Sequence, residues 1–114
     1  MTTGPKYRID VDSEGPVRRV IASGEIDLAS AGELETALTA EPEATVIADL
    51  SDVGFIDSTG LRSLLSSQEA VTNAGGRLLL VFDDGPVERI LNLTRLTDRF
   101  EVHSDVEAAT RAVL

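Results

Sequence analysis

Cysteine and tryptophan are both absent from this chain of 114 residues. Without thiols, the protein cannot form disulfides, thiolate metal sites or cysteine nucleophiles. Aromatic side chains are scarce, with one tyrosine and three phenylalanines, so the core has to be aliphatic. Long apolar runs are missing as well: none approaches the ~20 residues that span a bilayer, and residues 1–6 lack the apolar stretch of a signal peptide. We therefore expect a cytoplasmic protein without a membrane partner.

Basic residues are half as frequent as acidic ones, ten against twenty, which gives a net charge of −10. A field of that sign repels phosphate backbones, so we expect no nucleic-acid partner. It favours a protein partner with a basic docking face, although an acidic surface also serves solubility alone. The length suits one domain. We expect residues 1–114 to form that single domain, with residues 1–5 as a loose N-terminal segment.

Apolar residues recur along the chain with the periods of strands and helices. The expected strands are residues 7–12, 17–23, 44–50, 78–82 and 99–102. One helix is expected after Ser30, which with Glu33 matches a capping box, and a last helix after Ser104, which with Glu107 matches another. Between them we expect a helix over residues 58–73 and a short helix that begins near Pro86.

The connection between the first two expected strands, residues 13–16, is too short for a parallel crossover and predicts a hairpin. From there on, strands alternate with helices, which predicts a mostly parallel sheet with helices packed on it. We therefore expect an α/β fold: one mixed, mostly parallel sheet of about five strands with an N-terminal hairpin, and about four helices.

The most informative segment runs from Asp49 to Leu61. Its polar residues predict a loop that carries Asp57-Ser58-Thr59-Gly60 to the start of a helix. We expect Phe55 to be buried beneath this loop. We also expect Gly60 to leave the junction uncrowded, so that another protein can approach closely.

Chemistry alone leaves several roles for this segment. Asp57 or Ser58 can cap the helix, which is worth about 1 kcal/mol and needs no further assumption. A serine nucleophile needs a base, and the one histidine, His103, is expected in an exposed loop. An aspartyl phosphate at Asp49 needs a lysine, and the one lysine is Lys6. Finally, a partner kinase could phosphorylate Ser58, because free amides at a helix start would hold the phosphate.

Four segments together resemble the STAS domain family, in particular the bacterial anti-sigma-factor antagonists. Asp49-Leu50-Ser51, followed by Phe55-Ile56-Asp57-Ser58-Thr59-Gly60-Leu61, is similar to the signature of that family. Gly24-Glu25-Ile26-Asp27 resembles its motif before the first helix, and residues 75–81 resemble its glycine-led fourth strand. Residues 87–103 resemble its C-terminal third. The resemblance spans roughly residues 6–114.

The resemblance implies a switch. The unphosphorylated antagonist binds an anti-sigma factor that is also a serine kinase, and the sigma factor is released. Phosphorylation of Ser58, with Thr59 as the less favoured acceptor, ends the binding, and a PP2C-type phosphatase reverses it. The implied partner-binding residues are Asp27, Asp57, Ser58, Thr59 and Gly60, with Asp27 near Asp57 in space and a helix cap as its alternative role.

The resemblance further implies that the antagonist is not an enzyme and that it needs no metal or cofactor. The alternative function is that of a non-switching STAS interaction subunit in a transport or stress-signalling assembly. An intact Asp57-Ser58-Thr59-Gly60 segment favours the switch over this alternative.

Overall fold

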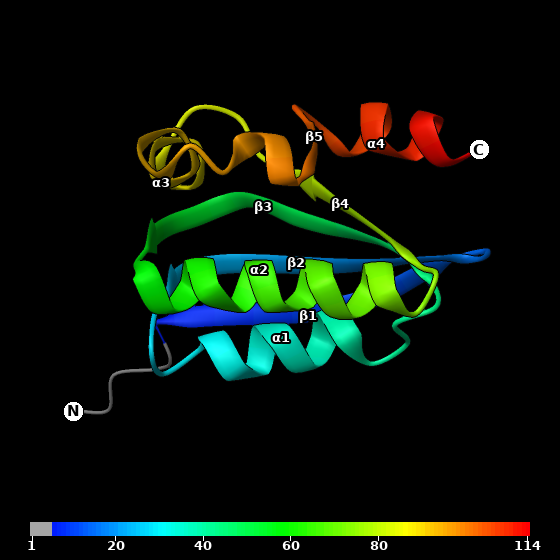
Figure 1. Cartoon of the computed structure of the whole chain (residues 1–114), viewed down its shortest axis with the longest axis horizontal. Coiled ribbons are helices and arrows are strands. Elements are labelled where there is room, and N and C mark those ends of the chain that lie inside the picture. The colour runs from blue at the N-terminus through cyan, green and yellow to red at the C-terminus, as the bar shows by residue number, and fades with distance from the viewer. Residues whose placement is uncertain (1–5) are drawn as a thin grey trace.

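The computed structural model describes residues 6–114, so the segment 1–5 expected to be loose lies outside it. The elements appear in the expected order (Figure 1). They are β1 (Tyr7–Glu14), β2 (Val17–Ile26), α1 (Ala31–Thr39), β3 (Thr45–Ile56), α2 (Ser58–Asn73), β4 (Arg77–Val81), α3 (Pro86–Thr94), η1 (Thr97–Arg99), β5 (Glu101–His103) and α4 (Val106–Val113).

The strands form one five-stranded sheet in the order β1-β2-β3-β4-β5. β1 and β2 form the predicted antiparallel hairpin, and the other neighbours pair in parallel. The hairpin turns at Gly15, whose φ of +61° is a left-handed conformation that glycine adopts without strain. The expected α/β fold, with its mixed, mostly parallel sheet, is confirmed.

The helices divide unequally between the two faces of the sheet. Alternate β3 residues Val46, Ala48 and Leu50 belong to the large core that also holds buried residues of α1, α2 and α3. Ile47 points to the opposite face and packs in a smaller cluster with Ala109 of α4. Three helices thus cover one face and α4 covers part of the other (Figure 1). The core is almost entirely aliphatic, as the composition requires.

β3 is longer than the sequence suggested. Residues 51–56, expected to be a loop, continue the strand and pair with the second half of β2. The register shifts twice along this stretch, between Ile21 and Ser23 and between Gly24 and Glu25. Such irregularities let an extended segment with polar residues stay in a sheet. Phe55 consequently points outward and is 47% exposed, so its expected burial is wrong.

Neither predicted capping box forms. The Ser30 hydroxyl does not cap α1; it donates to the Glu25 carbonyl (2.7 Å) and accepts from the Asp27 amide (3.0 Å). At α4 the cap is Asp105, one residue after the expected Ser104, and its carboxylate accepts from the Ala108 amide at 2.7 Å. A carboxylate is the stronger acceptor for helix amides, which explains the shift by one residue.

None of the helices in residues 6–114 is long and apolar enough to cross a membrane.

Candidate partner-binding site

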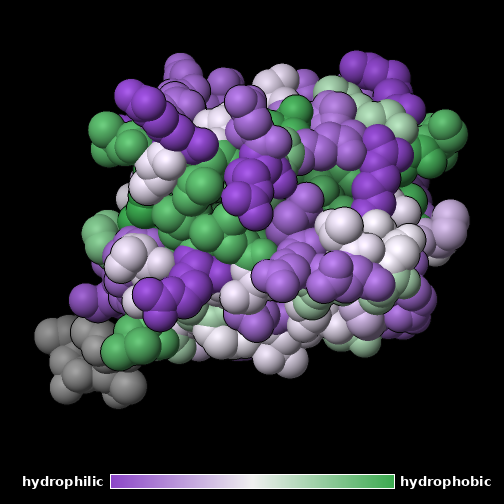
Figure 2. Space-filling view, in the orientation of Figure 1, coloured by the Kyte–Doolittle hydropathy of each residue, from purple (hydrophilic) through white to green (hydrophobic). Residues whose placement is uncertain are grey.

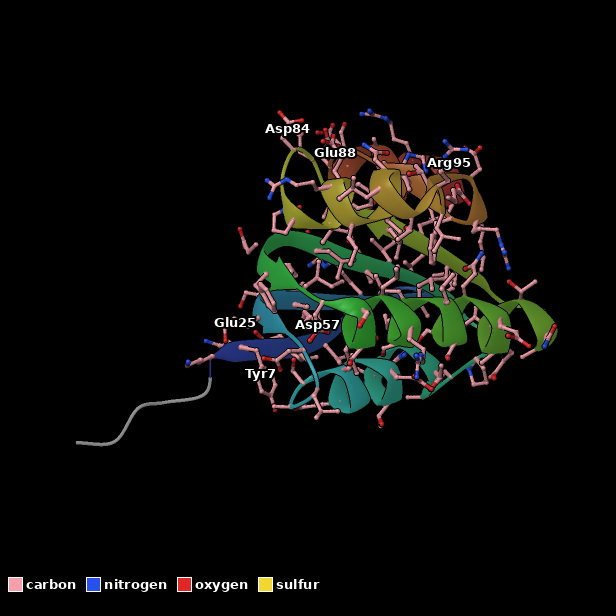
Figure 3. All side chains as sticks on the ribbon, turned by 60° about the vertical axis from the view of Figure 1, so that its left-hand side comes forward. Tyr7, Glu25, Asp57, Asp84, Glu88 and Arg95 are labelled. Atoms are coloured by element: carbon pink, nitrogen blue, oxygen red, sulfur yellow. The ribbon has the colours of Figure 1, made fainter. Side chains whose placement is uncertain are left out.

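The candidate site lies at the carboxyl ends of β2 and β3. Ile26 and Ile56, the last residues of these strands, are register partners. Asp27 and Asp57 follow them directly, and the Asp57 amide donates to the Ile26 carbonyl at 3.3 Å. The expected proximity of Asp27 and Asp57 follows from this register. Figure 3 shows Glu25, at the end of β2, and Asp57, at the start of α2, at the same end of the molecule.

Asp57 is the N-cap of α2. Its backbone is extended (φ −109°, ψ −172°), and its carboxylate oxygen accepts hydrogen bonds from the amides of Thr59 and Gly60, both at 3.0 Å. Asp57 therefore performs the capping role that the sequence divided between Asp57 and Ser58. Two of the free amides at the helix start are already occupied, so they are not available for a phosphate, contrary to the expectation from sequence.

Ser58 is the first residue of α2 and is exposed. Because Asp57 caps the helix, the Ser58 hydroxyl is not needed for capping. Thr59 is half-buried, one residue further into the helix. Of the two neighbouring hydroxyls, that of Ser58 is thus the more accessible.

Gly60 is buried, and it serves close packing within the protein. A Cβ atom at this position would lie 2.6 Å from the Ile26 carbonyl oxygen and 2.8 Å from Cγ1 of Ile56. Only glycine lets the first turn of α2 come so near to the ends of β2 and β3. The expectation that Gly60 makes room for a partner is therefore wrong: it makes room for the sheet and thereby positions Ser58.

Asp27 stabilises the turn between β2 and α1. Its carboxylate accepts from the Ala29 amide at 3.0 Å, and its carbonyl accepts from the amides of Ser30 (3.1 Å) and Ala31 (2.8 Å). The side chain remains half-buried rather than enclosed. Asp27 thus has a clear structural role, and its second carboxylate oxygen is available for other contacts.

Exposed apolar side chains surround this edge. Leu28 is 82% exposed and Leu93, on α3, is 79% exposed. An open groove of about 290 Å³ runs between the end of β3 and α3. It is lined by Gly54, Phe55, Ile56, Pro86, Arg89, Ile90 and Leu93. Figure 2 shows hydrophobic side chains gathered on the face between α2 and α3. Exposed apolar area of this kind is typical of protein-binding surfaces.

The exposure of Leu28 and Leu93 was not predicted from the sequence. For Leu93 a signal exists, because it lies off the helical stripe formed by the buried residues Val87 and Leu91. An apolar residue on the polar face of a short helix has no core to enter. Leu28, in the turn before α1, carries no such periodic signal.

The alternative chemistries receive no support from the geometry. His103 lies on β5, half-buried, with its ring nitrogen 3.2 Å from a Glu101 carboxylate oxygen, so its expected loop position is wrong. Because β4 separates β5 from β3, His103 does not lie on a strand next to the one that leads to Ser58. The carboxylate of Asp49, the residue considered as a phosphate acceptor, accepts a hydrogen bond from the Ser51 amide at 3.1 Å. Residues 6–114 contain no group of three or more acidic or histidine side chains placed to hold a metal ion.

Comparison with known proteins found a matching family and similar folds. A family model described as STAS domain matches residues 8–109. The crystal structure of an anti-sigma factor antagonist from Mycobacterium paratuberculosis is 30% identical in sequence, with 98% of each chain covered and a TM-score of 0.83.

Two more distant structures show the same fold. The anti-sigma factor antagonist SpoIIAA in its unphosphorylated form is 16% identical, with 92% of this chain and 96% of that chain covered and a TM-score of 0.74. The phosphorylated form of the Bacillus cell fate determinant SpoIIAA is 18% identical, with 92% and 99% covered and a TM-score of 0.69.

Proposed function

The chain belongs to the STAS domain family, and from this membership we propose that it is an anti-sigma-factor antagonist controlled by phosphorylation of Ser58. In its bare form it binds an anti-sigma factor that is also a serine kinase, and the sigma factor is released. The kinase then phosphorylates Ser58 and the complex dissociates. A PP2C-type phosphatase restores the bare form. The protein acts in the cytoplasm, catalyses no reaction itself and needs no metal or cofactor.

The observation that carries this proposal is the free hydroxyl of Ser58. It sits on the exposed first turn of α2, while the neighbouring Asp57 takes the capping role. A kinase can therefore modify Ser58 without breaking a hydrogen bond that holds the helix. Thr59 is less accessible, which supports Ser58 as the acceptor.

The surroundings of Ser58 suit a protein partner. The groove beside Phe55 and Leu93 offers apolar area that an interface would cover. Acidic side chains flank it: Asp57 and Glu25 on one side, and Asp84 and Glu88 near the start of α3 on the other (Figure 3). A partner with apolar side chains inside a basic rim would match both features.

Phosphorylation would work through charge. A phosphate adds about −1.5 to −2 charges at pH 7, next to a carboxylate that cannot turn away without uncapping α2. Enclosing that charge in an interface designed for a neutral hydroxyl would cost several kcal/mol. A loss of only about 1.4 kcal/mol already weakens binding tenfold, so this modification is sufficient to end the complex.

The test is phosphotransfer followed by mass spectrometry. Incubated with its anti-sigma kinase and ATP, the wild type should gain one phosphoryl group, mapped to Ser58. The Ser58→Ala variant should gain none and should still bind the kinase, while any phosphoryl group on Thr59→Ala should map to Ser58, which separates the two hydroxyls. Undiminished labelling of Ser58→Ala would refute the assignment. Tight binding without any labelling of the wild type would instead indicate a non-switching interaction module.

A further inference from the structure

Arg62 is the cation nearest to Ser58 along the exposed face of α2. It lies four residues, or one helical turn, after Ser58, and both residues are exposed. Within residues 6–114, the ion pairs that the structure contains do not include Arg62. Its guanidinium therefore has no carboxylate partner in the described part of the bare protein.

We propose that Arg62 binds the phosphate of phosphorylated Ser58 within the same helix; this inference rests on the proposed modification of Ser58. Side chains four residues apart on a helix have Cβ atoms about 5–6 Å apart, and the favourable order places the anion N-terminal to the cation. Ser58 and Arg62 have this order. A guanidinium also matches the phosphate oxygens with two parallel hydrogen bonds.

Arg62 is the basic residue of α2, the helix that carries Ser58. The amides of Thr59 and Gly60 are taken by the Asp57 carboxylate. The other charged groups at this end of the molecule are mostly acidic. The acidic ones are Asp57 on α2, Glu25 on β2 and Asp27 just after it, Asp52 on β3, Asp83 and Asp84 after β4, and Glu88 on α3; the basic ones are Lys6 and Arg8 at the start of β1, where Arg8 pairs with Asp10, and Arg89 on α3. Arg62 is the cation that shares the helix with Ser58.

Accessibility, and not spacing along the helix, distinguishes the two neighbouring hydroxyls. Arg62 lies four residues after Ser58 and three residues after Thr59, and both spacings bring side chains together on a helix. Ser58 is exposed whereas Thr59 is half-buried. The contact with Arg62 is therefore proposed for Ser58, the more accessible hydroxyl.

The consequence for the switch is that phosphorylation would change two groups at once. It would add negative charge at Ser58, and it would draw Arg62 away from any acidic group of a bound partner. The phosphate would also be held over the first turn of α2 and not extend freely into solvent, so that it would occupy the surface that a partner has to approach.

The experiment uses the full chain with phosphoserine incorporated at position 58 during translation, which needs neither kinase nor partner. The probe is a phosphorus-31 NMR titration of the second pKa of the phosphate. A cation at about 4 Å favours the dianion, so this pKa should be about half a unit lower in the wild type than in Arg62→Gln. Arg111→Gln is the matched control, because it removes the same charge from an exposed helix on the opposite face of the sheet.

Two further readouts separate a direct contact from a general charge effect. The Arg62→Lys variant should recover part of the shift, and phosphorylation should raise the melting temperature of the wild type more than that of Arg62→Gln. Equal pKa values in the wild type, Arg62→Gln and Arg111→Gln would overturn the proposal. That result would leave the proposed function intact, whereas failure of the kinase to label Ser58 would refute the function without affecting this titration.

Discussion

Replacement of Gly60 by alanine tests whether close packing at this position places Ser58. The added Cβ atom would lie 2.6 Å from the Ile26 carbonyl oxygen, 2.8 Å from Cγ1 of Ile56 and 3.0 Å from Cγ2 of Ile26. The carbonyl cannot simply move aside, because it accepts the Asp57 amide hydrogen bond at 3.3 Å. The first turn of α2 must therefore shift away from the sheet.

The expected magnitude combines two opposite effects. Overpacking in a well-packed site costs about 1–3 kcal/mol. Alanine is favoured over glycine within a helix by up to about 1 kcal/mol, and by less in the first turn. We expect Gly60→Ala to lower the free energy of unfolding by about 1–2 kcal/mol, or the melting temperature by roughly 4–8 °C for a domain of this size.

Gly32→Ala is the matched control. Gly32 also lies in the first turn of a helix, but a Cβ atom there would meet nothing within 4 Å. Its replacement should leave the stability unchanged or raise it slightly. Urea and thermal unfolding of both variants give the comparison. A Gly60→Ala protein as stable as Gly32→Ala would refute the argument that close packing at Gly60 positions Ser58.

Three other substitutions probe the surface and the sheet. Asp27→Ala should cost about 1 kcal/mol by loss of the bond to the Ala29 amide and should weaken partner binding; unchanged binding would leave Asp27 only a structural role. Leu93→Ser should change stability by no more than about 0.5 kcal/mol yet weaken binding, and equal affinity would remove the groove from the interface. Arg77 holds the pKa of Glu101 below its usual range, so the stability advantage of the wild type over Glu101→Gln should shrink as pH falls below about 4.5.

The ion pair between Glu101 and Arg77 explains why the stability difference between the wild type and Glu101→Gln should shrink at low pH. A carboxylate with a lowered pKa in the folded state contributes stability above its unfolded pKa, and the contribution is lost as pH falls through the folded pKa. Urea midpoints of the wild type and Glu101→Gln at several pH values measure it. A difference that stays constant down to pH 3 would show that the contact with Arg77 does not depend on the charge of Glu101.

The positions of the helices were largely predictable from local sequence patterns, although neither predicted capping box forms. The helix expected over residues 58–73 begins and ends as predicted, since an aspartate that caps precedes it and glycines follow it. Gly75 adopts a φ of +84°, the left-handed conformation that ends a helix. Likewise, the β1–β2 hairpin was predictable because its connection is too short for a parallel crossover.

Long-range pairing was not predictable in the same way. The extension of β3 through residues 51–56 depends on β2 supplying a partner with two register shifts, and no local pattern encodes such shifts. The exposure of Phe55 follows from the same extension. Similarly, Ser30 does not take its predicted capping role because its hydroxyl donates instead to the part-buried Glu25 carbonyl, five residues earlier.

For the candidate site, the resemblance identified Ser58 but not how the chain presents it. Asp57 was an expected cap, yet only the structure shows that its carboxylate accepts from two of the amides that a phosphate would otherwise use. The exposed apolar residues Leu28 and Leu93 also come from the structure, because their exposure depends on which faces of the turn and of α3 the core leaves uncovered.

The most direct test of the central claim is the affinity of the anti-sigma kinase for two forms of this protein, one with serine and one with phosphoserine at position 58. Isothermal titration calorimetry with a nonhydrolysable ATP analogue keeps each form intact during the measurement. We predict that the bare form binds and that the phosphorylated form binds at least about tenfold more weakly, the equivalent of 1.4 kcal/mol. Equal affinities for the two forms would contradict the claim that phosphorylation of Ser58 is the switch.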